Sequence, residues 1–152
     1  MKDCNNIIIF SIVVTHNGSK TIRDCLNSLE DSRYPVQTIV VENASTDNTS
    51  SLVKDYAKII YLPQEKNIGF GHANNIGIKY AFEHSADYVF LLNQDAMVEK
   101  DTIGKLLKVA LNNPEFGIIS PMHLNGEGSE IDPNVRNYLC KGNPNFLNDA
   151  YF

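Results

Sequence analysis

Residues able to do binding or catalytic chemistry gather in four polar segments, most of them placed directly after a short apolar run. Thr15-His16-Asn17 follows the first run, residues 42–47 follow the second, and Asn93-Gln94-Asp95 follows the fourth. The remaining segment, residues 67–75, leads from the third run into a helical pattern. A few amide, imidazole and carboxylate groups gathered in one place are typical of a small-molecule site. We therefore expect a binding site assembled from several loops.

Asp95 is the strongest candidate for a metal ligand. It lies just past the apolar run 88–92, which would hold its carboxylate at the end of a rigid strand. Mg²⁺ and Mn²⁺ prefer carboxylate oxygens and often complete their coordination with water and substrate phosphate. One carboxylate and two diphosphate oxygens would also let a protein of net charge −5 bind a diphosphate. The alternative is that Asp95 caps the short segment after it.

Several other polar residues have a structural alternative. Good N-caps for a following helix are Ser45, Thr46, Asp47 and Asn48, and capping alone would explain two or three of them. Gly69 needs no role beyond a turn. His72 falls on a helical face, where a histidine is more often packed or solvated than catalytic. Chance poorly explains three polar clusters at three strand ends, however, so we favour a functional site over packing.

The elements that must position these residues alternate along the chain. Short apolar runs predict strands over residues 7–15, 38–41, 59–62, 88–92 and 117–120. Apolar residues at helical spacing predict helices over residues 22–29, 52–57, 73–81 and 103–110. This alternation predicts an α/β fold with a mostly parallel central sheet and helices on both faces. Such sheets bind ligands beyond the carboxyl ends of their strands, where the polar segments lie.

Composition and charge narrow the classes of function. Of the 152 residues, 43% are apolar and 20% are charged, as in one globular domain. Lys and Arg number 13 against 18 Asp and Glu, and the resulting negative charge excludes a broad electrostatic grip on nucleic acid. No apolar stretch approaches the roughly 20 residues of a membrane span, so no transmembrane segment is expected. The three cysteines lack metal or redox spacing, which favours a reducing, cytoplasmic location.

Four motifs in order carry a resemblance to a known family. They are Val13-Val-Thr-His-Asn17, Val41-Glu-Asn-Ala-Ser-Thr-Asp47, Asn67-Ile-Gly-Phe-Gly-His-Ala-Asn-Asn-Ile-Gly77 and Leu91-Leu-Asn-Gln-Asp95. Over residues 7–125 the chain resembles the family 2 glycosyltransferases, and most of all the rhamnosyltransferase-like branch of bacterial surface-polysaccharide synthesis. The resemblance implies a Rossmann-like GT-A fold, a UDP- or dTDP-linked nucleotide-diphospho-sugar donor, and a saccharide or lipid-linked acceptor. It also implies Mg²⁺ or Mn²⁺ as cofactor and a cytoplasmic enzyme, free or peripheral at the inner membrane face.

The resemblance further implies a role for each segment. Thr15, His16 and Asn17 would line the nucleoside pocket, with His16 stacking on the base or bonding to it. Glu42 would contact the base or ribose, and Asp95 would hold the metal. The nucleotide-sugar-binding residues expected in full are Thr15, His16, Asn17, Glu42, Asn43, Asp47, Asn67, Gly69, Phe70, Asn74, Asn93, Gln94 and Asp95.

The remaining roles come with departures from the family pattern. Asn93 would lie near the ribose, and residues 67–75 would border the diphosphate and the sugar. Glu42 stands where the family usually has Asp, so one more methylene must fit. His16 replaces a frequent Tyr. Asn93-Gln94-Asp95 fills the Asp-x-Asp-like motif with a single carboxylate for the metal.

The alternating pattern ends after residue 121, which bears on domain organisation. We expect a nucleotide-sugar-binding domain at residues 1–122 and an incomplete C-terminal extension at 123–152, as in a truncated chain. The late acids include no adjacent pair of the family kind, so we expect no general base in this chain. These acids are Glu127, Glu130, Asp132 and Asp149. The alternative is a non-catalytic remnant that binds the donor or a partner, and a free sheet edge would allow homo-oligomers.

Three other classes fit less well. A dinucleotide-binding oxidoreductase needs Gly-x-Gly-x-x-Gly after the first strand, where this chain has His16-Asn-Gly-Ser-Lys20. Gly18-Ser-Lys-Thr21 suggests a P-loop, but Ser19 and Val14 stand where its two glycines belong. A receiver-type signalling domain needs acidic residues after its first strand, and this chain has none there.

Overall fold

The computed structural model describes residues 6–141, and the chain divides into two compact units, Met1–Val109 and Ala110–Phe152. The described strands are β1 (Ile9–Thr15), β2 (Gln37–Glu42), β3 (Ile60–Pro63) and β4 (Tyr88–Asn93). The described helices are α1 (Ile22–Glu30), α2 (Thr49–Lys54), α3 (Phe70–Glu83), α4 (Thr102–Asn112) and α5 (Pro133–Cys140).

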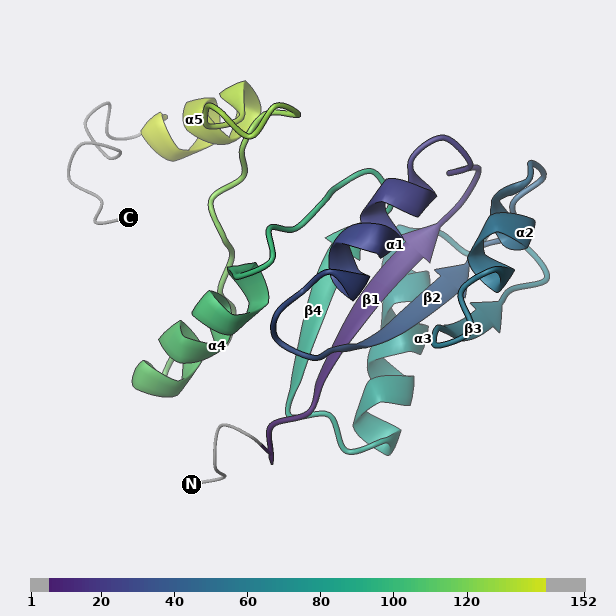
Figure 1. Ribbon diagram of the computed structural model, residues 1–152, viewed down its shortest axis with the longest axis horizontal. Coiled ribbons are helices and arrows are strands. Elements are labelled where there is room, and N and C mark those ends of the chain that lie inside the picture. The colour runs from purple at the N-terminus through teal and green to yellow at the C-terminus, as the bar shows by residue number, and fades with distance from the viewer. Residues whose placement is uncertain (1–5, 142–152) are drawn as a thin grey trace. The chain divides into compact units, whose positions relative to one another are not determined.

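The described strands form one parallel sheet in the order β3-β2-β1-β4 (Figure 1). The chain leaves β1 toward β2 and β3 on one side and returns to add β4 on the other. This reversal creates a topological switch point between β1 and β4, the position at which open α/β sheets bind ligands. Thr15 lies opposite Glu42 and Val14 lies opposite Asn93, so the three strand ends are level. The predicted parallel sheet is confirmed.

Both faces of the sheet are covered, which explains why all seven residues of β1 are buried. Val13 and Ile22 belong to one core cluster, to which α1, α2 and α4 contribute. Ile12 and Val41 belong to a second cluster, to which α3 contributes. Successive strand residues point to opposite faces, so a continuous apolar run serves both clusters. Figure 1 shows α1 and α3 on opposite sides of the sheet.

α3 approaches the sheet closely at Gly77. A Cβ atom at this position would lie 2.6 Å from Ile12 Cγ2 and 3.3 Å from Val41 Cγ2. Both neighbours are fully buried core side chains. The missing side chain of Gly77 therefore sets the distance between α3 and the two central strands, β1 and β2.

The predicted apolar stripe of α1 is confirmed, whereas α2 begins and ends earlier than residues 52–57. The Asp47 carboxylate accepts a hydrogen bond from Thr49 N at 3.0 Å, which starts α2 at Thr49. Tyr56 lies beyond the end of α2, and its hydroxyl donates to Asn27 Oδ1 on α1 at 2.8 Å. The helix therefore ends at Lys54, two residues before Tyr56.

The predicted strand over residues 117–120 is wrong. The structure has no strand there, and Ile118 is 94% exposed. An apolar run becomes a strand only when a neighbour pairs with its backbone groups, and none of the described strands pairs with these residues. In the described part of the second unit, Leu124 and Ile131 form an isolated antiparallel bridge instead.

The second unit also contains α5, which begins at an Asp-Pro cap. Asp132 accepts hydrogen bonds from the backbone N–H groups of Asn134 and Val135, and Pro133 fills the first turn. No residue of α5 is buried. Asp149, one of the late acids, lies outside the described residues. Within residues 6–141, no helix has both the length and the apolar character needed to cross a membrane.

Candidate functional site

The candidate site lies at the carboxyl ends of β1, β2 and β4, where three of the four polar segments meet. Thr15, the last residue of β1, is fully buried, and its backbone carbonyl accepts a hydrogen bond from Asn43 N at 2.8 Å. Asn93 ends β4 with an exposed side chain, and its carbonyl accepts from Ala96 N at 3.1 Å. The sheet thus brings together residues that are about eighty positions apart in the sequence.

The imidazole of His16 is held in one orientation. Its Nδ1 lies 3.0 Å from the carbonyl oxygen of Asn43. A carbonyl can only accept, so Nδ1 carries the proton in this hydrogen bond. Nε2 lies 3.4 Å from the amide nitrogen of Asn17, which can donate to it. His16 is therefore a half-buried ring with a fixed tautomer at the edge of the site.

Asn17 joins the loop after β1 to the loop after β2. Its backbone has φ of 51°, the left-handed region that asparagine tolerates better than most residues. Its Oδ1 accepts a hydrogen bond from Thr46 N at 2.8 Å, and its own N–H donates to Ser45 Oγ at 3.0 Å. The predicted capping residues Ser45 and Thr46 thus bind a neighbouring loop.

Glu42 and Asp47 use their carboxylates within the loop after β2. Glu42 is buried, and its Oε1 accepts from Ser45 N at 2.6 Å, closing a tight turn. Asp47 is exposed and accepts hydrogen bonds from Thr49 and from Ser19 N, the latter at 3.2 Å. The bonds donated by Thr49 and Ser19 hold the pKa of the Asp47 carboxyl well below its usual range. Asp47 thus bonds to the first residue of α2, whereas the N-cap position itself is held by Asn48, whose side chain makes no capping hydrogen bond.

The fourth polar segment joins the site through Asn43, which is 3% exposed. Its Nδ2 donates to Asn67 Oδ1 at 2.9 Å, and its Oδ1 accepts from Ile68 N at 2.9 Å. Asn67 Oδ1 also accepts from Gly69 N, and Gly69 has φ of 82°. Asn43 therefore fixes the turn that leads into α3.

Two further predicted residues lie at the start of α3. Asn74 is buried, and its amide nitrogen donates to the carbonyl of Phe70 one turn earlier at 3.1 Å. Phe70 is 57% exposed. The Asn74 side chain thus forms a hydrogen bond within its own helix, whereas the Phe70 side chain is accessible to a ligand.

Gln94 turns its side chain back toward the end of β1. Its Oε1 accepts from Thr15 Oγ1 at 2.6 Å and from His16 N at 3.0 Å. Its Nε2 donates to the carbonyl of His16 at 3.2 Å. Asp95 is exposed, and its carboxylate has no hydrogen bond or ion pair with any other residue in the described part of the chain. The Gln94 side chain is therefore bonded to the end of β1, whereas the Asp95 carboxylate is free to bind a ligand.

Cys25 of α1 contacts the end of β4, a link to this site that sequence reasoning missed. The thiol is buried and donates a weak hydrogen bond to the carbonyl of Asn93 at 3.5 Å. Burial raises the pKa of the Cys25 thiol to about 12, and the negative charge of Asp95 adds to the shift. Its place on the apolar stripe of α1 predicted only packing. The contact with β4 depends on the sheet order and had no signal in the sequence.

A divalent cation would have to be held jointly by this protein and a ligand. Among residues 6–141, no group of three or more His, Cys, Asp or Glu side chains could coordinate one. The free Asp95 carboxylate provides one hard oxygen ligand, and Mg²⁺ or Mn²⁺ can take the rest from phosphate and water. The donor set therefore fits a metal shared with a diphosphate.

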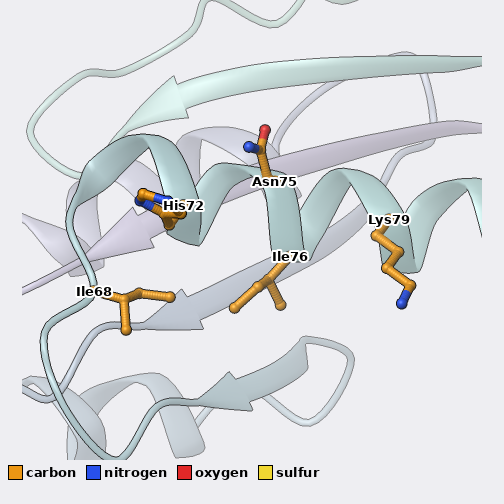
Figure 2. Close-up of a pocket in the computed structure, with 5 residues that line it drawn as sticks. All are labelled: Ile68, His72, Asn75, Ile76 and Lys79. Carbon is orange, nitrogen blue, oxygen red and sulfur yellow. The ribbon is translucent and has the colours of Figure 1, made fainter.

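A groove of about 590 Å³ lies along α3 and the turn that leads into it. It is lined by Ile68, His72, Asn75, Ile76 and Lys79. Figure 2 shows Ile76 and Asn75 pointing to different sides of the helix. None of the thirteen residues expected to bind the nucleotide sugar lines the groove, but Ile68, His72 and Asn75 belong to residues 67–75, the segment expected to border the diphosphate and the sugar.

Comparison with known proteins identifies relatives of the chain. The poly-beta-1,6-N-acetyl-D-glucosamine synthase of Staphylococcus epidermidis is 30% identical over 113 residues, which are 72% of this chain and 27% of that protein. The UDP-N-acetylglucosamine–dolichyl-phosphate N-acetylglucosaminyltransferase of Methanococcus voltae is 27% identical over 128 residues, covering 74% of this chain and 51% of that protein. The chain thus spans 27% and 51% of the length of these curated relatives.

The fold is shared with solved glycosyltransferases. The mannosyltransferase PcManGT of Pyrobaculum calidifontis, solved in complex with GDP-Man and Mn²⁺, superposes with a TM-score of 0.62 at 26% identity. The match covers 67% of this chain and 32% of that one. The family described as Glycosyl transferase family 2 matches residues 11–149, which is most of the chain. With this match, the chain belongs to glycosyl transferase family 2 and has its GT-A fold.

Proposed function

We propose that the ends of β1, β2 and β4 bind the nucleotide-diphospho-sugar donor of a glycosyltransferase reaction. The observation that carries this proposal is the exposed Asp95 carboxylate, without a protein partner among the described residues, beside loops that hydrogen bonds tie together. Membership of glycosyl transferase family 2 supports it. A free acid next to a rigid polar rim is what a metal-bridged diphosphate requires.

Each strand-end segment has a proposed task. His16 contacts the base with its ring face or its Nε2, because Nδ1 is engaged by the carbonyl of Asn43. Glu42 and Asn93 serve the base and the ribose, and Asp95 lies at the diphosphate. Residues that shape the loops around the donor, or that border its diphosphate and sugar, are Thr15, Asn17, Asn43, Asp47, Asn67, Gly69, Phe70, Asn74 and Gln94.

The proposed reaction is displacement at the anomeric carbon. An acceptor hydroxyl attacks this carbon, a new C–O bond forms, and the C–O bond to the diphosphate breaks, so the nucleoside diphosphate leaves with the bonding electron pair. The acceptor proton passes to a general base, and we assign this role to no residue. A bound Mg²⁺ or Mn²⁺ would neutralise charge on the leaving diphosphate. Asp95 orients that end of the donor.

We propose a UDP- or dTDP-linked donor, transfer of a hexosyl or rhamnosyl unit, and a saccharide or lipid-linked acceptor in surface-polysaccharide synthesis. The names of two relatives support the UDP-linked donor and the saccharide or lipid-linked acceptor, since one is a polysaccharide synthase and the other names a UDP-sugar and a dolichyl phosphate. Residues 1–122 would form the donor-binding domain, and residues 123–152 the start of the acceptor side. We place the reaction in the cytoplasm, and homo-oligomers through the edge strand β4 stay a prediction.

Calorimetric titration tests donor binding and the role of Asp95. We expect UDP or dTDP to bind the whole chain in the presence of Mn²⁺, and Asp95→Ala to weaken this binding about tenfold or more and to remove its dependence on Mn²⁺. Asp31→Ala is the matched control, because Asp31 is an exposed acid at the end of α1 and its carboxylate forms an ion pair with Lys100. No heat with millimolar nucleotide, or equal binding by Asp95→Ala, would contradict the proposal.

A transfer assay separates an enzyme from a donor-binding module. The donor is mixed with saccharide or lipid-linked acceptors, and product and free sugar are both measured by mass spectrometry. Transfer supports the full proposal. Donor binding with only slow hydrolysis supports the alternative, a non-catalytic nucleotide-sugar-binding module.

A further inference from the structure

We propose that Gln94 is a positioning residue: its side-chain amide adds one rung to the pairing of β1 with β4 and so fixes both His16 and Asp95. The inference concerns how the site is held together, and its functional meaning rests on the proposed donor binding. In this role Gln94 acts through His16 and Asp95 and does not itself contact the donor.

The first argument is the hydrogen-bond pattern. The backbone pairing of the two strands ends at Val14 and Asn93. One residue further on, the Gln94 side chain meets both backbone groups of His16, accepting from its N–H at 3.0 Å and donating to its carbonyl at 3.2 Å. A terminal amide carries one acceptor and two donors, so it can bind a backbone unit as another peptide group would. The sheet is thereby continued by a side chain.

The second argument is the environment of the amide oxygen. Gln94 Oε1 also accepts from Thr15 Oγ1 at 2.6 Å, and Thr15 is fully buried. Hydrogen bonds shielded from water in this way are stronger than exposed ones, and leaving such groups without partners is costly. Removal of the amide would therefore leave the Thr15 hydroxyl and the two backbone groups of His16 without these hydrogen-bond partners.

The third argument is the space that Gly18 leaves for the amide. A Cβ atom at Gly18 would lie 2.3 Å from Gln94 Oε1 and 2.9 Å from Thr15 Oγ1. The φ of Gly18 is not in the left-handed region, so its backbone conformation does not require glycine. The absent side chain provides room for Gln94. Gly18, Thr15 and Gln94 therefore pack closely together, and a side chain at Gly18 would displace the Gln94 amide.

This anchoring decides what the end of β4 offers to a ligand. Asn93 and Asp95 have exposed side chains, while Gln94 between them is half-buried against β1. Gln94 and Asp95 lie in the turn after β4, which the Ala96 N–H closes by donating to the Asn93 carbonyl at 3.1 Å. The hydrogen bonds of the Gln94 amide to Thr15 and His16 hold this turn, and with it the backbone that carries the exposed Asp95 carboxylate.

The test compares Gln94→Ala and Gly18→Ala in the full chain by amide hydrogen exchange and by titration with UDP and Mn²⁺. Both variants should lower the protection of the His16 amide about tenfold, and both should weaken UDP binding about tenfold, with Val13 protection unchanged. Gln37→Ala is the control for Gln94, because Gln37 begins β2, at the end of the sheet remote from the proposed site. Gly104→Ala is the control for Gly18, because its Cβ would meet only Tyr34 Cβ at 3.8 Å.

A double variant provides the decisive measurement. Once Gln94→Ala has removed the amide, Gly18→Ala should cause no further loss, so the two effects should be strongly non-additive. Fully additive losses, or unchanged His16 protection in either single variant, would overturn the positioning role. If the unmodified chain bound no UDP, donor binding would fail as a proposal, while the His16 protection would still decide the role of Gln94.

Discussion

At the scale of single residues, each proposed donor contact depends on a neighbour that fixes it. His16 takes its tautomer from the carbonyl of Asn43, and Asp95 lies in a turn that the Gln94 side chain ties to the end of β1. The residue types of all four were visible in the sequence. Their partners were not, because Gln94 and Thr15 become neighbours only through the register of β4 on β1.

Cys25 gives a prediction about reactivity. Its thiol is buried, and its pKa is raised to about 12, so it should react with iodoacetamide far more slowly than the partly exposed Cys140. A timed pulse at pH 8 followed by peptide mass spectrometry would measure both rates. Equal rates in the folded chain would contradict the buried position of Cys25, and labelling in urea provides the control.

The raised pKa of the Cys25 thiol also has a consequence for the free energy of unfolding at high pH. Because the folded pKa is higher than the ordinary value of about 8.5, the neutral thiol favours the folded state. The contribution is fully present below the ordinary value and declines as the pH rises toward the raised pKa of about 12. The free energy of unfolding of Cys25→Ala, measured in urea from pH 8 to pH 11, should therefore fall less steeply than that of the unmodified chain.

At the scale of elements, the contact of α3 with the sheet gives a prediction about packing. Gly77→Ala would press a methyl group against the buried Ile12 and Val41, and such overpacking costs about 1–3 kcal/mol. Urea unfolding would measure the loss. Gly71→Ala, also in α3, is the matched control because its Cβ would meet no atom within 4 Å. Equal stability of the two variants would contradict the close approach at Gly77.

Elements were predictable where pattern and environment agree. The run that became β1 is apolar on both faces, and the α1 stripe faces the sheet, so both were placed correctly. The run at 117–120 looked equally apolar, but strand formation depends on a pairing partner that the local sequence cannot reveal. The end of α2 was misplaced for a related reason, since Tyr56 bonds to Asn27 on another helix.

At the scale of the whole molecule, the negative net charge and the available metal ligands lead to a prediction about how Mn²⁺ and UDP bind. The chain has a net charge of −5, and within residues 6–141 no cluster of three or more potential metal ligands exists. We therefore expect Mn²⁺ and UDP to bind weakly alone and to assist each other. By linkage, Mn²⁺ should raise the affinity for UDP by the factor, on the order of ten or more, by which UDP raises the affinity for Mn²⁺.

Paired titrations would measure both factors, with UDP titrated at fixed Mn²⁺ and Mn²⁺ at fixed UDP. Uridine, which lacks the phosphates, is the control ligand and should show no linkage. Tight Mn²⁺ binding without nucleotide would point to ligands other than Asp95 and would overturn the shared site.

The strand order also has a consequence for when a newly made chain gains the proposed donor binding. The hydrogen bond from Thr15 to Gln94 spans 79 positions, and β4 is the last of the described strands to be synthesised. During translation, β1, β2 and β3 can pair while half of the donor rim is still missing. Contacts of such high sequence separation form late and slowly. Recognition of a nucleotide sugar should therefore appear abruptly, once β4 has left the ribosome and docked, rather than build up with chain length.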